Sequence, residues 1–337
     1  MRRGSIAALI GIGLIAGGVA AAVALLIPWL PPDASRQAGR TDFLFWFVVT
    51  ICIVIFAIVT AVMIYSIWRF RAAPDDTSDG PPIHGNTALE IAWTVIPTIL
   101  VTAIGVTSAI VLSRNGAVAS NVMRINVTAQ QFAWTFSYPE ANGLSSSTLM
   151  LPKNREVELY MQSRDVIHSF FVPQFRLTQD IVPGITTKLV ITPDKDGTYP
   201  VICHELCGLG HATMRTTAVV MEPAAFDRWL KSQSKAIGSP NPSVAGLTVF
   251  NDNGCAACHT LTAAKAKGTV GPDLDKLKQY AQQAKQPLQS FISTSITDPN
   301  AYIQPGYPKN VMPPTFGKSL TKQQLDSLVS YLVASSK

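Results

Sequence analysis

The chain has 337 residues and a net charge of +6, and 47% of its residues are hydrophobic. Only 14% are charged, whereas soluble globular proteins contain roughly 25% charged residues. This shortage of charge predicts a membrane portion. The positive charges are spread along the chain without a run of five like charges, which excludes a nucleic-acid-binding protein with a basic stripe.

Three stretches lack Asp, Glu, Lys and Arg for long enough to cross a bilayer, which takes about 20 residues. They are Gly4–Leu30, Phe43–Trp68 and Ile91–Leu112. The first follows two arginines and contains small-residue triplets, so residues 1–30 are either a cleaved signal peptide or an additional transmembrane segment. The other two predict a two-helix transmembrane hairpin over residues 43–112.

The charges around the hairpin predict its orientation. Arg69 and Arg71 lie between its two spans, and the positive-inside rule places them on the cytoplasmic side. We therefore expect a multi-pass protein of the cell inner (plasma) membrane, with everything after Leu112 on the outer, periplasmic side. Cys52 lies in the middle of a span and is predicted to be a buried apolar thiol.

The composition changes after the hairpin. Short alternating runs separated by turn residues fill residues 122–222 and predict an antiparallel β-sandwich, which we place at residues 116–225. These runs are Met123–Phe136, Val157–Met161, Lys188–Thr192, Tyr199–Cys203 and Thr216–Met221. A polar linker follows at residues 232–243. Residues 244–337 have amphipathic helical patterns, clearest at Thr321–Leu332, and predict an all-α domain.

One segment of the sandwich is rich in metal-binding residues. Cys203, Cys207, His211 and Met214 follow one another closely, and His168 lies upstream. Thiolates, imidazoles and a thioether are a ligand set suited to copper. Two thiolates on one loop can bridge two copper ions and leave each ion one histidine and one weaker ligand.

Two alternatives use the same residues. Cys203 and Cys207 could form a disulfide, or the two cysteines and two histidines could hold a structural zinc ion. Neither alternative explains Met214, and zinc has no redox chemistry. The sequence therefore favours copper and electron transfer, because a site whose ligand positions are all filled by protein leaves no place for a substrate.

A second motif lies in the C-terminal domain. Cys255, Cys258 and His259 form the CxxCH pattern of covalent c-type haem attachment, in which the histidine becomes an iron ligand. The alternative is a thioredoxin-like redox pair. Such a pair lies in a βαβ pattern, which the sequence around these cysteines does not have. Met312 is the only methionine after Cys258, and no histidine follows His259. Met312 is therefore the expected second axial ligand, and such a Met/His pair suits an electron carrier.

The sequence resembles subunit II of haem-copper cytochrome c oxidases over about residues 40–225. The matching runs are CHELCGLGHATM (203–214), DVIHSFFVP (165–173) and LEIAWTVIPT (89–98). The resemblance implies a cupredoxin domain with a binuclear CuA centre. It assigns Cys203 and Cys207 as bridges, His168 and His211 as terminal ligands, and Met214 and the carbonyl of Glu205 as axial ligands.

The same family implies further roles. The Glu205 side chain would bind magnesium at the interface with subunit I, and Glu90 would stand at the start of a proton path into subunit I. Electrons would enter the copper domain through an aromatic cluster, here Phe132 and Trp134, where the family usually begins with tryptophan. The C-terminal domain resembles class I cytochromes c, in which the Pro272 carbonyl would orient His259 and the helix 321–332 would pack near Phe250.

The five histidines all lie outside the apolar segments, so a membrane-buried haem would have to be held by another chain. We therefore expect the subunit through which electrons enter a proton-pumping cytochrome c oxidase, with haem c and CuA in this chain. The oxygen-reducing centre would be in subunit I, and subunit III, lipid and a soluble or membrane cytochrome donor would be partners. The alternatives are the CuA-bearing subunit of a nitric oxide reductase and a membrane-tethered copper carrier.

Overall fold

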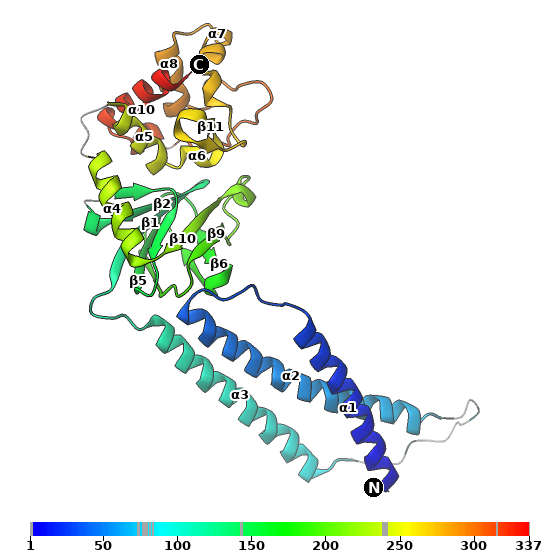
Figure 1. The fold of residues 1–337 in the computed structure, drawn as a ribbon. Helices are drawn as coiled ribbons and strands as arrows, with labels where there is room; N and C mark the ends of the chain where they lie inside the picture. Colours follow the sequence, from blue (N-terminus) through cyan, green and yellow to red (C-terminus); the bar gives the residue numbers. More distant parts are fainter. Residues whose placement is uncertain are drawn as a thin grey trace. The chain divides into compact units, whose positions relative to one another are not determined.

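The computed structural model describes residues 3–72, 75, 80, 82, 84–141, 144–237, 242–314 and 316–336. The chain forms two compact units, which are Met1–Pro32 with Gly39–Gly116, and Asp33–Ala38 with Ala117–Lys337. The first unit is helical, and the second contains a β-sandwich followed by a helical domain (Figure 1). This confirms the predicted combination of membrane helices, an all-β sandwich and a C-terminal helical domain.

Helices α1 (Arg3–Leu26), α2 (Arg36–Arg69) and α3 (Thr87–Gly116) make up the first unit. Each is long and apolar enough to cross a membrane. Small residues bring α1 close to α2: a Cβ atom on Gly17 would lie 3.2 Å from the Cβ of Ala57, and one on Gly13 would lie 3.5 Å from the Cβ of Ala61. Close approach at small residues is how helices associate in lipid, where the hydrophobic effect does not drive them together.

The expected burial of Cys52 is wrong. Its side chain is exposed on the surface of α2, because it does not lie on the face that meets α1. A thiol is apolar enough to face hydrocarbon, so the residue still suits a membrane span.

Two five-stranded sheets form the sandwich (Figure 1). The first has the order β3-β2-β1-β5-β8, with β1 (Met123–Gln130), β2 (Ala133–Tyr138), β3 (Leu144–Ser146), β5 (Val157–Ser163) and β8 (Thr187–Ile191). The second has the order β4-β10-β9-β6-β7, with β4 (Leu149–Pro152), β6 (His168–Val172), β7 (Leu177–Ile181), β9 (Gly197–Cys203) and β10 (Arg215–Met221). Three single turns of 3-10 helix connect them, at Pro139–Ala141, Pro173–Phe175 and His211–Thr213.

The structure corrects the predicted sandwich in three ways. It is mixed and not purely antiparallel, because β1 pairs with β5 and β10 pairs with β4 in parallel. The predicted single run Met123–Phe136 is a hairpin, in which Gln131 and Phe132 form the turn between β1 and β2. Strands β3, β4, β6 and β7 were not predicted; in β6 nearly all residues are buried, so no alternation marks it.

The core of the sandwich forms where alternate side chains of the two sheets meet. Met123, Ile125 and Val127 of β1 point inward and are essentially fully buried. Helix α4 (Pro223–Ile237) covers the end of this core with Phe226 and Trp229, whose rings contact Tyr138. The predicted linker at 232–243 is therefore shorter in the structure, because its first residues continue α4.

The segment Asp33–Ala38, whose last three residues begin α2, belongs to the same compact unit as the sandwich. Ser35 forms a β-bridge with Pro193, and its hydroxyl donates to the Phe175 carbonyl at 3.0 Å. Lys195 reaches Asp33 at 2.7 Å. This segment is thus bonded to the loops that follow Val172 and Ile191 of the sandwich.

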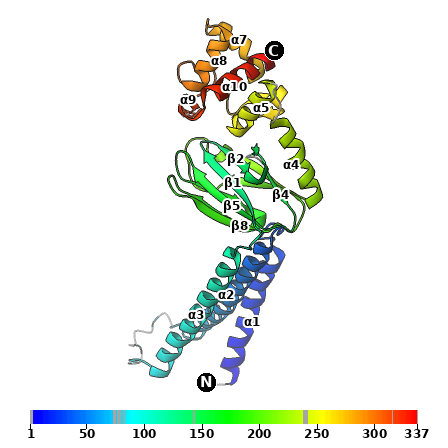
Figure 2. The same ribbon diagram turned by 90° about the vertical axis from the view of Figure 1, so that its left-hand side faces the viewer.

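The C-terminal domain is built from short helices: α5 (Pro242–Asp252), α6 (Cys255–Cys258), α7 (Leu277–Gln283), α8 (Leu288–Thr297), α9 (Phe316–Ser319) and α10 (Lys322–Ser335). It also contains a two-stranded sheet of β11 (Thr260–Leu261) and β12 (Ala266–Lys267), and 3-10 turns at Thr262–Ala264 and Leu274–Lys276. Thr321 caps α10 with a reciprocal pair of bonds to Gln324. As predicted, α10 packs near Phe250, whose ring contacts that of Tyr331. Figure 2 shows α10 beside α5.

The crossing of α5 and α10 depends on Gly246. A Cβ atom there would lie 2.3 Å from both the Ser327 carbonyl oxygen and the Tyr331 Cβ. We expect Gly246→Ala to force the helices apart and destabilise the domain by roughly 1–3 kcal/mol. Calorimetric thermal unfolding measures this, with Gly39→Ala, where a methyl group would meet nothing within 4 Å, as the control. An unchanged unfolding temperature in Gly246→Ala would contradict the close packing of α5 on α10.

Candidate metal and haem centres

The loop between β9 and β10 carries most of the predicted metal ligands. Cys203 ends β9, and Met214 directly precedes β10. His168 begins β6, which pairs with β9 so that Phe170 lies opposite Cys203. The sheet thereby brings a histidine that is remote in sequence to the base of the loop.

The side chains of this loop converge on one place. The metal-binding atoms of His168, Cys203 and Cys207 lie within 4.8 Å of one another, and all three residues are buried. The two cysteines are free, with 3.8 Å between their sulfur atoms. The structure therefore has two separate thiols here and no disulfide.

The cluster has two halves. The Cys203 sulfur lies 3.8 Å from His168 Nδ1 and 3.3 Å from the Glu205 carbonyl oxygen. The Cys207 sulfur lies 3.5 Å from His211 Nδ1 and 3.8 Å from the Met214 sulfur. Each thiol thus has one imidazole and one weak donor beside it.

The electrostatics of the two thiols suit a cation. Burial raises the pKa of the Cys203 thiol, but hydrogen bonds, above all to His168, outweigh it and lower this pKa to about 6. Burial and the adjacent Cys203 thiolate raise the pKa of Cys207 to about 12. A positive charge placed between the sulfurs would favour the thiolate form of both. Two thiolates, two imidazoles and a thioether favour copper over zinc.

Two residues of the same loop lie apart from the cluster. The His204 ring stacks on Phe171 with 4.7 Å between ring centroids, so it does not face the thiols. The Glu205 side chain is exposed, while its carbonyl faces Cys203. The two groups of Glu205 thus point to different places, as its two expected roles require.

The aromatic residues Phe132 and Trp134 take different positions. The Trp134 indole is buried, donates to the Met214 carbonyl at 3.4 Å and meets the His168 ring edge-on. It therefore packs under the copper ligands and does not face solvent. The Phe132 ring lies against Gly208 and Gly210 of the copper loop, where a Cβ atom would come within 3.3 Å and 2.4 Å of ring atoms.

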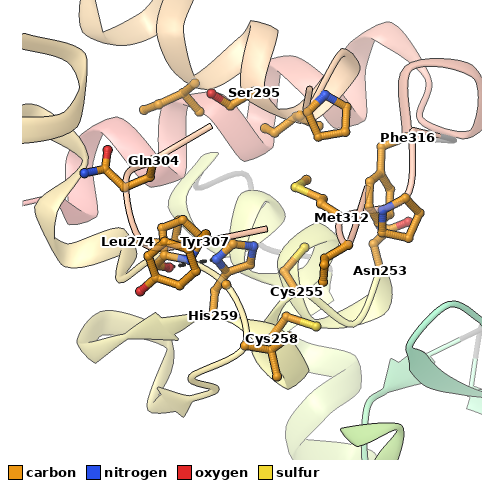
Figure 3. Close-up of a pocket in the computed structure, with 18 of the residues that line it drawn as sticks. Asn253, Cys255, Cys258, His259, Leu274, Ser295, Gln304, Tyr307, Met312 and Phe316 are labelled. Atoms are coloured by element: carbon orange, nitrogen blue, oxygen red, sulfur yellow. Dashed lines mark hydrogen bonds between the residues drawn. The ribbon is translucent and has the colours of Figure 1, made fainter. Parts of the chain in front are cut away.

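The CxxCH motif lines a large cavity in the C-terminal domain. Cys255, Cys258, His259 and Met312 all border it, as Figure 3 shows. The described lining residues are apolar or neutral polar, with no Asp, Glu, Lys or Arg among them. Such a cavity suits a flat, largely apolar group such as haem.

The orientation of His259 is fixed in the way expected for an iron ligand. Its Nδ1 lies 2.8 Å from the Pro272 carbonyl oxygen, which confirms the predicted contact and leaves Nε2 free for iron. Burial lowers the pKa of His259, which keeps the ring neutral. Gly271 is required beside it, since a Cβ atom there would lie 2.5 Å from the imidazole.

Glu90 lies in the first turn of α3. Its carboxylate accepts a hydrogen bond from the Asn86 backbone N–H at 3.1 Å, while the Asn86 side chain accepts one from the Leu89 N–H. This reciprocal arrangement caps the helix. Glu90 thus has a structural role in addition to the role expected from the family.

Comparison with known families agrees with this geometry. The chain matches the transmembrane domain of cytochrome c oxidase subunit II over residues 23–111, its periplasmic domain over residues 143–222, and cytochrome c over residues 243–336. Cytochrome c oxidase subunit 2 of Synechocystis sp. is 34% identical over 263 residues, which cover 64% of this chain and 78% of the relative. The chain belongs to the cytochrome c oxidase subunit 2 family.

Other relatives extend the match. The subunit 2 proteins of Thermostichus vulcanus and Alkalihalophilus pseudofirmus are 33% and 29% identical, covering 62% and 84% of this chain and 80% and 82% of the relatives. Among solved structures, the periplasmic domain of subunit II of cytochrome oxidase of Bradyrhizobium japonicum is 25% identical and covers 35% of this chain and 98% of that domain, with a TM-score of 0.34.

The protein is therefore a subunit of cytochrome c oxidase. This family match argues against the two alternative functions, a nitric oxide reductase subunit and a copper carrier. The protein's cupredoxin and cytochrome c domains imply a CuA copper centre and a haem, and the residues present fit both groups.

Two residues of the copper site were not predicted. Asp165 accepts hydrogen bonds from His168 Nε2 at 2.8 Å and from the Gln131 backbone N–H at 2.7 Å. The Gln131 side chain donates to the Cys207 carbonyl at 2.6 Å. The spacing of Asp165 and His168 in DVIH was the available signal, whereas nothing in the sequence connects Gln131 to residues 76 positions away.

The two halves of the thiol cluster predict how substitutions at the copper site differ. Oxidised protein should give an electron paramagnetic resonance spectrum of one unpaired electron shared by two coppers. Met214→Leu should retain two coppers with a shifted potential, because a weak axial ligand tunes more than it holds. Cys207→Ser should lose the shared-electron spectrum, because it removes a bridge. A four-line mononuclear spectrum from fully loaded wild-type protein would contradict the binuclear assignment.

The haem cavity predicts the effect of losing Met312. Met312→Ala should leave haem attached through Cys255 and Cys258, abolish the methionine-to-iron absorption band and lower the potential by on the order of 100 mV, since axial ligands set haem potentials over a range of about 0.8 V. Val311→Ala in the same loop is the control. Persistence of the band in Met312→Ala would mean that another residue is the ligand.

Proposed function

We propose that this chain is the subunit through which electrons enter a proton-pumping cytochrome c oxidase, and that they pass from haem c to binuclear CuA and on to the oxygen-reducing centre of subunit I. The observation that carries this route is the lining of the haem cavity. Gln131, Phe132 and Ala133 of the sandwich border the same cavity as Cys255 and Met312. The turn that touches the copper loop thus also touches the haem site.

Direct contacts between the sandwich and the cytochrome domain support this proposal. The Gln130 side chain donates to the Asn253 carbonyl at 3.1 Å, and both residues are buried. Gly254 packs so closely on Ala133 that a Cβ atom at Gly254 would lie 2.1 Å from the Ala133 Cβ. Gly254 directly precedes Cys255, so this contact holds the haem attachment site against the turn between β1 and β2.

The ligand roles follow from the distances within the two clusters. Cys203 and Cys207 would bridge the two coppers, His168 and His211 would be terminal ligands, and Met214 and the Glu205 carbonyl would be weak axial ligands. Haem would be attached through Cys255 and Cys258 and ligated by His259 and Met312. We further propose that the exposed Glu205 carboxylate binds magnesium at the interface with subunit I.

We also propose an orientation for the membrane helices. The charges near the end of α2 support a cytoplasmic position for Arg69 and Arg71 and a periplasmic position for the copper and haem domains. The close contact of Gly17 with Ala57 supports retention of α1 as a third span. Glu90 would then lie at the cytoplasmic end of α3, where a proton path into subunit I would begin.

The donor is proposed to meet the cytochrome domain. Residues 244–337 contain nine lysines, five aspartates, no glutamate and no arginine. This surplus of positive charge suits a soluble or membrane cytochrome with an acidic docking face, because complementary charges raise association rates. Subunits I and III would complete the complex within the membrane.

Removing the cytochrome domain tests the route. A chain that ends after Ile237 keeps α4 and its contacts with Tyr138, so it should retain the shared-electron copper spectrum. It should oxidise the natural donor at least tenfold more slowly, because the haem that receives the electrons is gone. Oxygen uptake at fixed ionic strength measures this, and the full-length complex is the control. Full activity of the truncated complex with the natural donor would disprove the internal route.

A further inference from the structure

The turn of Gln131 and Phe132 is hydrogen-bonded to both halves of the ligand cluster, the half around Cys203 and the half around Cys207. Through its backbone, Gln131 donates to Asp165 Oδ2 at 2.7 Å, and Asp165 Oδ1 lies 2.8 Å from His168 Nε2. Through its side chain, Gln131 donates to the carbonyl oxygen of Cys207 at 2.6 Å. One residue thus reaches a histidine of one half and a cysteine of the other.

Both carboxylate oxygens of Asp165 accept hydrogen bonds. Its Oδ1 accepts from the Val166 backbone N–H at 2.7 Å as well as from His168. Its side chain is only 14% exposed, and that of His168 is fully buried. With Nε2 donating to Asp165, the other nitrogen of His168 faces Cys203, which fixes the ring in the orientation that a metal ligand needs.

The copper loop leaves room for this turn by means of glycines. A Cβ atom on Gly208 would lie 2.8 Å from Gln131 Nε2 and 3.3 Å from the Phe132 ring, and Gly208 has φ +130°. A Cβ atom on Gly210 would lie 2.4 Å from the same ring. The loop therefore packs directly on the turn, with no space for a side chain or a water molecule between them.

We propose that Gln131 and Asp165 are positioning residues that hold the Phe132 turn against the copper ligands and supply a bonded path from the turn to Cys207 and His168. Electron tunnelling falls steeply with distance and is faster through bonded contacts than across gaps, so loss of either bond slows transfer into the copper site. This inference rests on the proposed route from haem c to CuA. It assigns a function to two residues that touch no substrate.

Gln131→Met is the decisive variant. Methionine has a similar length and keeps the backbone bond to Asp165, but it cannot donate to the Cys207 carbonyl. The matched control is Gln179→Met, because Gln179 lies on β7 and, among the residues the structure describes, its amide donates to the neighbouring Asp180 carbonyl and to no copper-loop residue. Both variants are prepared as the complete oxidase complex with copper and haem.

Three measurements apply to each complex. Transfer from photoreduced haem c to CuA gives the rate, spectroelectrochemistry gives both midpoint potentials, and electron paramagnetic resonance gives the copper spectrum. For Gln131→Met we expect at least a fivefold lower transfer rate with both potentials and the copper content unchanged. Gln179→Met should match wild type in every measurement. A wild-type rate in Gln131→Met would overturn the proposal.

Asp165→Asn provides a second test that does not depend on the first variant. Asparagine has one acceptor oxygen and cannot serve Gln131 and His168 together. We expect a lower transfer rate and a change in the histidine nitrogen couplings of the copper spectrum, which a merely structural role elsewhere would not produce. Unchanged nitrogen couplings together with a wild-type rate would overturn the role of Asp165.

The same experiment separates this inference from the route on which it rests. If wild-type protein shows no transfer from photoreduced haem c to CuA, the proposed route is wrong. If wild type transfers and Gln131→Met transfers equally fast, the route holds and the positioning role is wrong. Should Gln131→Met fail to load copper, Gln131→Asn, whose shorter side chain keeps an amide but cannot reach Cys207, is read by the same criteria.

Discussion

The pairing of β6 with β9 is the constraint on which the copper site depends. It places His168 beside Cys203 even though 35 positions separate them. The register of this pairing decides to which face each side chain points, because a shift by one residue would turn His168 to the other face of the sheet. The loop after Cys203 then supplies the remaining ligands locally. A long-range sheet contact and a short ligand loop together bring the donor atoms of the site to one place.

The sequence predicts local features of this protein better than remote ones. The membrane helices and the CxxCH motif are each encoded within a short stretch and were found for that reason, whereas the Pro272 contact was implied by the resemblance to class I cytochromes c. The parallel pairing of β1 with β5 was missed, because alternation identifies a strand but not its neighbour. Gln131 was missed for a similar reason: its partner at Cys207 is chosen by the fold and leaves no local pattern.

The linker between the sandwich and the cytochrome domain is short, and the two domains contact each other directly. A flexible tether would raise the effective concentration of haem near copper to the millimolar range without fixing a geometry. Here α4 ends at Ile237 and α5 begins at Pro242, so little chain remains between the two helices. The buried bond from Gln130 to Asn253 adds a defined contact. The arrangement resembles a docked complex more than two domains that meet by diffusion.

The Phe132 ring links the two centres more closely than their separate folds suggest. It packs on Gly208 and Gly210 of the copper loop and also lines the cavity that contains Cys255. A protein interior is close-packed, so a shift of this ring against the loop would also change the wall of the cavity. Constraints on the copper loop therefore extend to the haem cavity, and Phe132 is constrained in shape by both. An aromatic side chain meets this demand because it is large and rigid, which explains why a smaller residue in this position would loosen two sites at once.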